Sequence, residues 1–157
     1  MNTYAIALTL HILAVVIWVG GMFFAYMCLR PAAGELDPPV RLGLWSRVFA
    51  RFFPWVWASV LMLWATGLWI IFVYYGGFSG IKKAPHIHLM LTFALAMTGI
   101  YWYVYFSLFS RFQSALKGGD FNQAAAGLNR IRVMIAVNLT LGILTVIIGA
   151  GGRLIRF

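Results

Sequence analysis

The sequence predicts an all-α integral membrane protein, a four-helix bundle whose helices cross the bilayer in up-down-up-down order. Of the 157 residues, 63% are hydrophobic and 10% charged, whereas a soluble domain is nearer half apolar and about a quarter charged. Four apolar runs cause this excess, at about residues 4–29, 53–75, 85–109 and 131–150. Each could cross a hydrocarbon core about 30 Å thick, which needs roughly 20 helical residues. Because lipid cannot satisfy backbone amides, continuous runs of this kind favour helices.

The first run is expected to be a spanning helix rather than a cleavable signal. No basic segment precedes it, and it ends in Cys28-Leu29-Arg30 instead of a small-residue cleavage site. Cys28 is the one cysteine of the chain, which excludes an intrachain disulfide and a cluster of thiolates.

The connection between spans 1 and 2, residues 31–51, is the longest. Prolines and a glycine interrupt its start, and apolar residues then recur at helical spacing: Leu42, Leu44, Trp45, Val48 and Phe49. Arginines occupy the other faces of this segment. The pattern predicts a short amphipathic helix lying in the cytoplasmic interface between spans 1 and 2.

The other connections are short. A glycine-rich loop precedes Pro85, which suits the first turn of the third helix. Gly118-Gly119-Asp120 predicts a turn, followed by a helical interfacial stretch over residues 121–132. The chain contains no linker or repeat, so we expect a single domain over residues 1–157 in which cofactor sites form between facing helices.

On the fourth span, Asn138 and Thr145 share a face with two glycines, Gly142 and Gly149. Small and amide residues of this kind first indicate helix packing. Hydrogen bonding to a ligand or quinone is the second interpretation of this face.

The net charge of +9 is explained by topology. Eight cations flank the first and third connections: Arg30, Arg41, Arg47, Arg51, Arg111, Lys117, Arg130 and Arg132. Four lie on the opposite side: Lys82, Lys83, Arg153 and Arg156. The positive-inside rule then predicts a bacterial inner-membrane protein with both termini in the periplasm. We expect a lipid bilayer and not nucleic acid as the partner of this charge, and the composition is compatible with a homo-oligomer.

The three histidines, His11, His86 and His88, all fall near the same end of a span. His11 lies about seven residues inside the first span, roughly 10 Å deep at 1.5 Å per residue. Ionisable side chains at that depth usually face the protein interior. His86 and His88 project roughly 200° apart on a helix, so only one is expected to face the bundle centre. Which one it is remains open, and a histidine bonded to a neighbouring helix is the plainer alternative.

Imidazoles from two helices beside a flat apolar slot are typical of haem b ligation. His11 with His86 or His88 would supply the axial ligands, and Trp18 would line the apolar slot that holds the haem. Lys83 and Arg153 would pair with the haem propionates. Copper is the competing metal, because imidazole and thioether ligands suit it and Met22 and Met90 lie near the histidines in sequence.

The first helix resembles that of the CopD-like membrane proteins, through Leu10-His11-Ile12-Leu13-Ala14 and then residues 17–23, Ile-Trp-Val-Gly-Gly-Met-Phe. It is also similar to the first helix of HemJ-type protoporphyrinogen oxidases. Residues 52–57 and His86-Ile87-His88-Leu89-Met90 look typical of the small stand-alone branch of this group. The resemblance implies haem b binding with His11 as a ligand, or copper handling. His88 stands where HemJ-type enzymes would show a lysine, and an Asn-Glu-x-Pro element is missing, which weighs against porphyrinogen oxidation.

The leading hypothesis from the sequence is a haem b membrane cytochrome that transfers electrons near the periplasmic face, with a quinone as the expected redox partner. It would be a haem-dependent membrane oxidoreductase, although no catalytic residue is identified. The alternatives are a copper-binding transport or resistance protein and a HemJ-like protoporphyrinogen oxidase.

Overall fold

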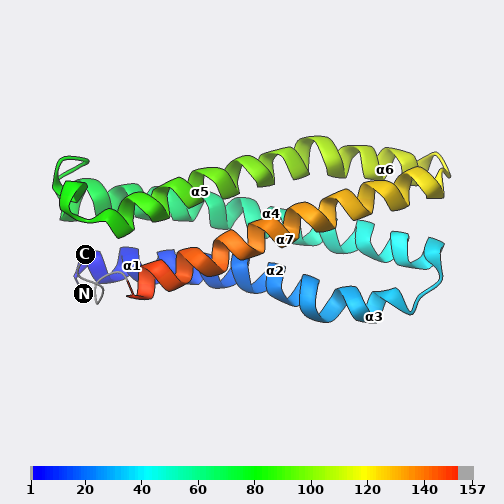
Figure 1. Cartoon of the computed structure of the whole chain (residues 1–157), viewed down its shortest axis with the longest axis horizontal. Coiled ribbons are helices and arrows are strands. Elements are labelled where there is room, and N and C mark those ends of the chain that lie inside the picture. The colour runs from blue at the N-terminus through cyan, green and yellow to red at the C-terminus, as the bar shows by residue number, and fades with distance from the viewer. Residues whose placement is uncertain (1, 152–157) are drawn as a thin grey trace.

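The structure is a computed structural model and describes residues 2–151. Four long helices, residues 3–34, 38–74, 85–117 and 121–151, are long and apolar enough to cross a membrane. Successive helices run in opposite directions along one bundle (Figure 1). No strand occurs among the described residues. The all-α, four-span prediction is therefore confirmed.

The long helices are divided where the helical turn changes. The first comprises α1 (Thr3–Val15), η1 (Val16–Gly20), α2 (Gly21–Phe23), η2 (Phe24–Leu29) and α3 (Arg30–Gly34). The second comprises α4 (Pro38–Trp69) and η3 (Ile70–Tyr74), and the third α5 (Pro85–Tyr103), η5 (Val104–Phe109) and α6 (Ser110–Lys117). The fourth is α7 (Phe121–Gly151), and a short 3-10 turn, η4 (Gly80–Lys83), precedes α5. The segments η1, η2, η3 and η5 are wider π-type turns.

Polar caps and special backbone positions set the helix ends. The Asn2 side chain accepts a hydrogen bond from the Tyr4 amide at 3.1 Å, and the Asp120 side chain accepts one from the Gln123 amide at 2.9 Å. Each satisfies a donor that the first helical turn leaves unpaired. Gly119 has a φ of +75°, which only glycine adopts readily, so the predicted turn before α7 is confirmed.

The predicted short interfacial helix between spans 1 and 2 is not a separate element. Its residues form the first half of α4, which continues unbroken through Pro54. The reason is a continuous buried face, since Leu42, Trp45 and Phe49 are at most 2% exposed and Phe53 continues the same row. Residues 121–132 are helical as predicted and form the first turns of α7; their interfacial position stays a prediction.

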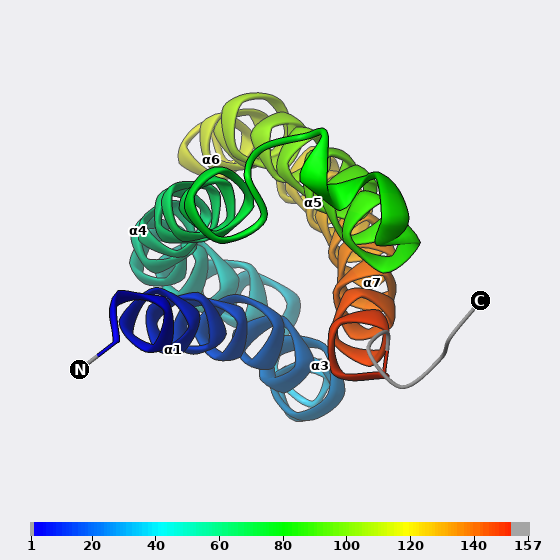
Figure 2. The same ribbon diagram turned by 90° about the vertical axis from the view of Figure 1, so that its left-hand side faces the viewer.

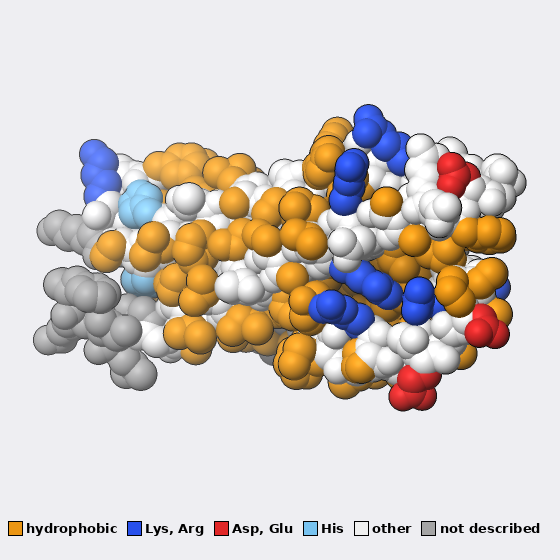
Figure 3. Space-filling model, turned by 45° about the vertical axis from the view of Figure 1, so that its right-hand side comes forward, with side chains coloured by type: hydrophobic (Ala, Val, Ile, Leu, Met, Phe, Trp, Pro, Cys, Tyr) orange, Lys and Arg blue, Asp and Glu red, His pale blue; other side chains and the backbone are white. Residues whose placement is uncertain are grey.

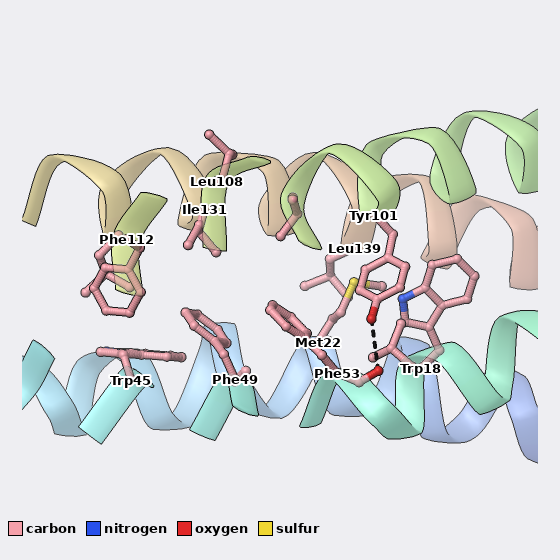
Figure 4. Packing of buried hydrophobic residues seen from close by; sticks show 14 of the residues in the cluster. Trp18, Met22, Trp45, Phe49, Phe53, Tyr101, Leu108, Phe112, Ile131 and Leu139 are labelled. Atoms are coloured by element: carbon pink, nitrogen blue, oxygen red, sulfur yellow. Dashed lines mark hydrogen bonds between the residues drawn. The ribbon is translucent and has the colours of Figure 1, made fainter. Parts of the chain in front are cut away.

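The helices pack in two close pairs, α1 with α4 and α5–α6 with α7. Seen along the bundle, α1 and α5 therefore lie across from each other (Figure 2). Aromatic rings fill much of the core: Phe49 and Phe53 stack at 5.2 Å, and Phe109 meets Phe53 edge-on at 4.9 Å. The Tyr101 hydroxyl donates to the Phe53 carbonyl at 2.9 Å, which joins α5 to α4 (Figure 4).

Charge is distributed unevenly along the bundle. Figure 3 shows most of the visible Lys and Arg side chains toward one end, over a band of hydrophobic surface, and the visible histidines at the other end. This asymmetry is the pattern from which the sequence predicted topology.

Gly142 tests the close approach of α7 to its neighbours. A Cβ at this position would lie 2.9 Å from the Val19 side chain and 3.2 Å from the Met97 side chain. We expect Gly142→Ala to lower stability by about 1 kcal/mol, as overpacking does, measured by thermal unfolding in detergent. Gly20→Ala is the control, because nothing lies within 4 Å of its added Cβ. Equal stability of the two variants would contradict this packing.

Candidate functional site

His11 is held between two helices by a hydrogen bond to α4. Its Nδ1 lies 2.8 Å from the Thr66 hydroxyl oxygen. That hydroxyl lies 2.6 Å from the Met62 carbonyl oxygen, one turn earlier on α4. Gly67 gives the ring room, since a Cβ there would lie 3.3 Å from His11 Cε1.

This arrangement fixes where the imidazole carries its proton. A hydroxyl has one proton, and the Thr66 hydroxyl donates it to the Met62 carbonyl, which can only accept. With that proton engaged, Thr66 accepts from His11, and we infer that Nδ1 is the protonated nitrogen. In the neutral ring, Nε2 then keeps its lone pair. A histidine whose second nitrogen is anchored in this way has the orientation of a typical metal ligand.

His88 shows the opposite tautomer by the same reasoning. Its Nε2 lies 3.1 Å from the Ile81 carbonyl oxygen in η4. Because a carbonyl cannot donate, Nε2 carries a proton, and in the neutral ring Nδ1 then keeps its lone pair. His86, in the same first turns of α5, is partly buried. Two of the three histidines thus have one nitrogen anchored and the other available to a metal.

The histidines share one end of the bundle but not one compact site. Among residues 2–151, no three His, Cys, Asp or Glu side chains lie close enough together to hold one metal ion. His11 belongs to the α1–α4 pair, and His86 and His88 to the helix that packs on α7. Ligation by His11 together with one histidine of α5 stays a prediction.

Of the other predicted cofactor residues, Trp18 is the one whose side chain the structure describes. Trp18 is 3% exposed and meets the Tyr101 ring edge-on at 6.1 Å, at one end of the labelled row of core residues (Figure 4). Arg153 and the side chain of Lys83 lie outside the described part of the structure. Their pairing with haem propionates therefore stays a prediction.

Trp18 lines a cavity of about 330 Å³ in the middle of the bundle. Its wall is almost entirely apolar, with Asn138 as its amide residue. Asn138 is 3% exposed, and its Oδ1 has no hydrogen-bond partner among the described residues. The sequence predicted helix packing first and hydrogen bonding to a ligand second for Asn138, and the structure places it buried on a cavity wall.

Thr66 is the site residue that sequence reasoning missed. It lies 55 positions from His11, and the local signal is one hydroxyl next to a glycine within an apolar run. A polar residue followed by a glycine on a spanning helix marks a place where another helix can approach closely. It does not reveal which helix approaches.

Thr66→Val keeps the shape of the side chain and removes the acceptor for His11. We expect a loss of stability of about 1–2 kcal/mol, because the buried Nδ1–H loses its partner. Thermal unfolding in detergent measures this. Thr140→Val is the matched control, since the Thr140 hydroxyl bonds only to the Ala136 carbonyl of its own helix. An equal loss in both variants would contradict the anchoring role of Thr66.

Asn138→Leu should act in the opposite direction. An apolar side chain of similar size removes a buried oxygen that has no partner, so stability should rise by about 1 kcal/mol. The measurement is the shift in unfolding temperature relative to Asn129→Leu, an exposed position of the same helix. A clear loss of stability in Asn138→Leu would show that its amide has a partner that the packing does not reveal.

The chain was compared with known protein families, curated proteins and solved structures. The family model described as CopD, copper resistance protein D, matches residues 46–151. No curated protein and no solved structure matches the chain.

Proposed function

Because this chain belongs to the CopD, copper resistance protein D, family, we propose that it binds and transfers copper ions within the membrane. Copper is its cargo, and the histidines at one end of the bundle receive it. The family match carries this proposal. It favours the copper alternative over the haem hypothesis that led the sequence analysis.

The chemistry of the histidines supports copper binding. Neutral imidazole is a good copper ligand, and the anchored tautomers leave His11 Nε2 and His88 Nδ1 with lone pairs. Thioether sulfur also suits copper in its reduced form. Met90 follows His88 by two residues on α5, and Met62 lies one turn from Thr66 on α4. Met90 is therefore near His88 in sequence, and Met62 is one turn from the threonine that contacts His11.

The distribution of charge indicates on which side of the membrane the histidines lie. The arginines among the described residues gather at the end opposite the histidines, and the positive-inside rule assigns that end to the cytoplasm. We propose that the protein lies in a bacterial inner membrane, that both termini are periplasmic and that copper arrives at the periplasmic end.

The test is a Cu(I) titration of the protein in lipid nanodiscs against a colorimetric chelator. The background variant is Cys28→Ser, because the exposed Cys28 thiol would bind Cu(I) adventitiously. We expect saturable binding in this background. His11→Gln and the double variant His86→Gln/His88→Gln should each weaken it by at least about tenfold, and Thr66→Val by about tenfold as an outer-shell partner.

Met27→Leu is the control for this titration, since Met27 is an exposed thioether on η2 toward the other end of the first long helix. Binding that survives the loss of all three histidines, or that falls equally in Met27→Leu, would overturn the proposal.

Haem b is the second candidate, and one observation favours it. His11 and His88 come from helices that lie across the bundle from each other, and each has one nitrogen available (Figure 2). Two imidazoles from different helices could serve as axial ligands of haem b, and bound haem would supply one-electron redox chemistry. An absorption spectrum of the protein expressed with ample haem separates the two candidates: a Soret band that His11→Gln abolishes supports haem, and its absence supports copper.

A further inference from the structure

Three arginines from three different helical segments converge on one pocket at the end of the bundle opposite the histidines. Arg30 begins α3, Arg41 lies in the first turns of α4, and Arg132 lies in α7. Together they line a pocket of about 410 Å³. Of the described residues that line this pocket, none is Asp or Glu, and the remainder are Tyr26, Met27, Pro31 and Gly34.

Neutral groups hold each of these cations in place. The Arg30 guanidinium lies 4.7 Å from the centre of the Tyr26 ring, and that of Arg132 lies 5.4 Å from the centre of the Trp45 ring. Arg41 donates to the Gly34 carbonyl at 3.4 Å. These contacts orient the arginines but do not neutralise them, so three like charges remain together.

Arg132 also has an unsatisfied donor. Its Nε is buried and has no hydrogen-bond partner among the described residues. A buried donor on a charged group is costly to leave unpaired. A guanidinium is also the side chain best suited to bidentate recognition of phosphate oxygens. An anion in this pocket would satisfy the donor and offset the repulsion among the arginines.

We propose that this arginine pocket (Arg30, Arg41 and Arg132) binds a phosphate group, and that the phosphate belongs to the headgroup of an anionic phospholipid. The surroundings favour lipid as the source. Met27, on the pocket wall, is 55% exposed and faces outward from a helix that is apolar enough to span the membrane. Basic pockets between membrane helices on the cytoplasmic side are suited to anionic headgroups. This proposal does not depend on copper binding.

The probes are dioleoyl phosphatidylglycerol, dioleoyl phosphatidylcholine and inorganic phosphate, each added to the delipidated full chain in detergent. Native mass spectrometry measures the bound lipid, and thermal unfolding confirms that each variant is folded. We expect phosphatidylglycerol to bind at least about tenfold more tightly than phosphatidylcholine, as charge-assisted hydrogen bonds would give. Arg132→Gln should weaken phosphatidylglycerol binding by about tenfold, the loss expected for one such bond. Arg30→Gln, which changes an exposed residue, should weaken it by the same factor.

Arg47→Gln is the matched control, because Arg47 is an exposed arginine of α4 that does not line the pocket. It should leave lipid binding unchanged. If millimolar inorganic phosphate displaces phosphatidylglycerol, the phosphate site stands but its ligand is free phosphate; if it does not, the lipid assignment stands. Equal binding of the two lipids would overturn the proposal that the arginine pocket binds an anionic headgroup. An equal loss of lipid affinity in Arg47→Gln and Arg132→Gln would overturn it as well.

Discussion

Within a membrane, every buried polar group must find its partner inside the protein, and this constraint shapes the whole bundle. Most hydroxyls meet it locally: those of Thr98, Thr140 and Thr145 all donate to a carbonyl one turn earlier on the same helix. Thr98 and Thr66 each have a lone pair left on the same oxygen for a group from another helix, the Trp64 indole for Thr98 and His11 for Thr66. The way His11 is held follows from that remaining lone pair.

The same constraint turns a packing contact into a chemical one. A histidine that donates through one nitrogen must present the other as an acceptor if the ring is neutral. His11 and His88 both satisfy this condition, through a threonine hydroxyl in one case and a backbone carbonyl in the other. The structure therefore explains why histidines in an apolar bundle can be ligands and not only bonded core residues. At the opposite end, the arginine pocket is the converse case, in which donors outnumber the acceptors that the described chain offers.

Much of the fold could be predicted because it depends on local properties of the sequence. Span number followed from the four apolar runs, and the turn before α7 from Gly118-Gly119-Asp120. The start of α4 was misjudged because arginines lower the average hydropathy there, while the buried row of Leu42, Trp45 and Phe49 continues the helix. In a sequence, a proline such as Pro54 suggests that a helix is interrupted. Here α4 continues through Pro54, which lies on the exposed face of the helix.

The site was less predictable because it depends on which helices meet. Sequence reasoning identified the histidines by residue type, and it placed them at one end correctly. It could not reveal that Thr66 faces His11 or that Asn138 faces a cavity, since both depend on how the helices rotate and pair. The convergence of Arg30, Arg41 and Arg132 was equally hidden, because the sequence explained these residues as topological charge.

The central claim is that the bundle fixes the proton on His11 Nδ1 and leaves Nε2 free for a metal. The most direct measurement is a ¹⁵N correlation spectrum of the histidine side chains in metal-free protein, assigned with His11→Gln. We expect a proton-bearing Nδ1 and a bare Nε2 for His11, with the reverse for His88. A His11 ring that carries its proton on Nε2 would contradict it.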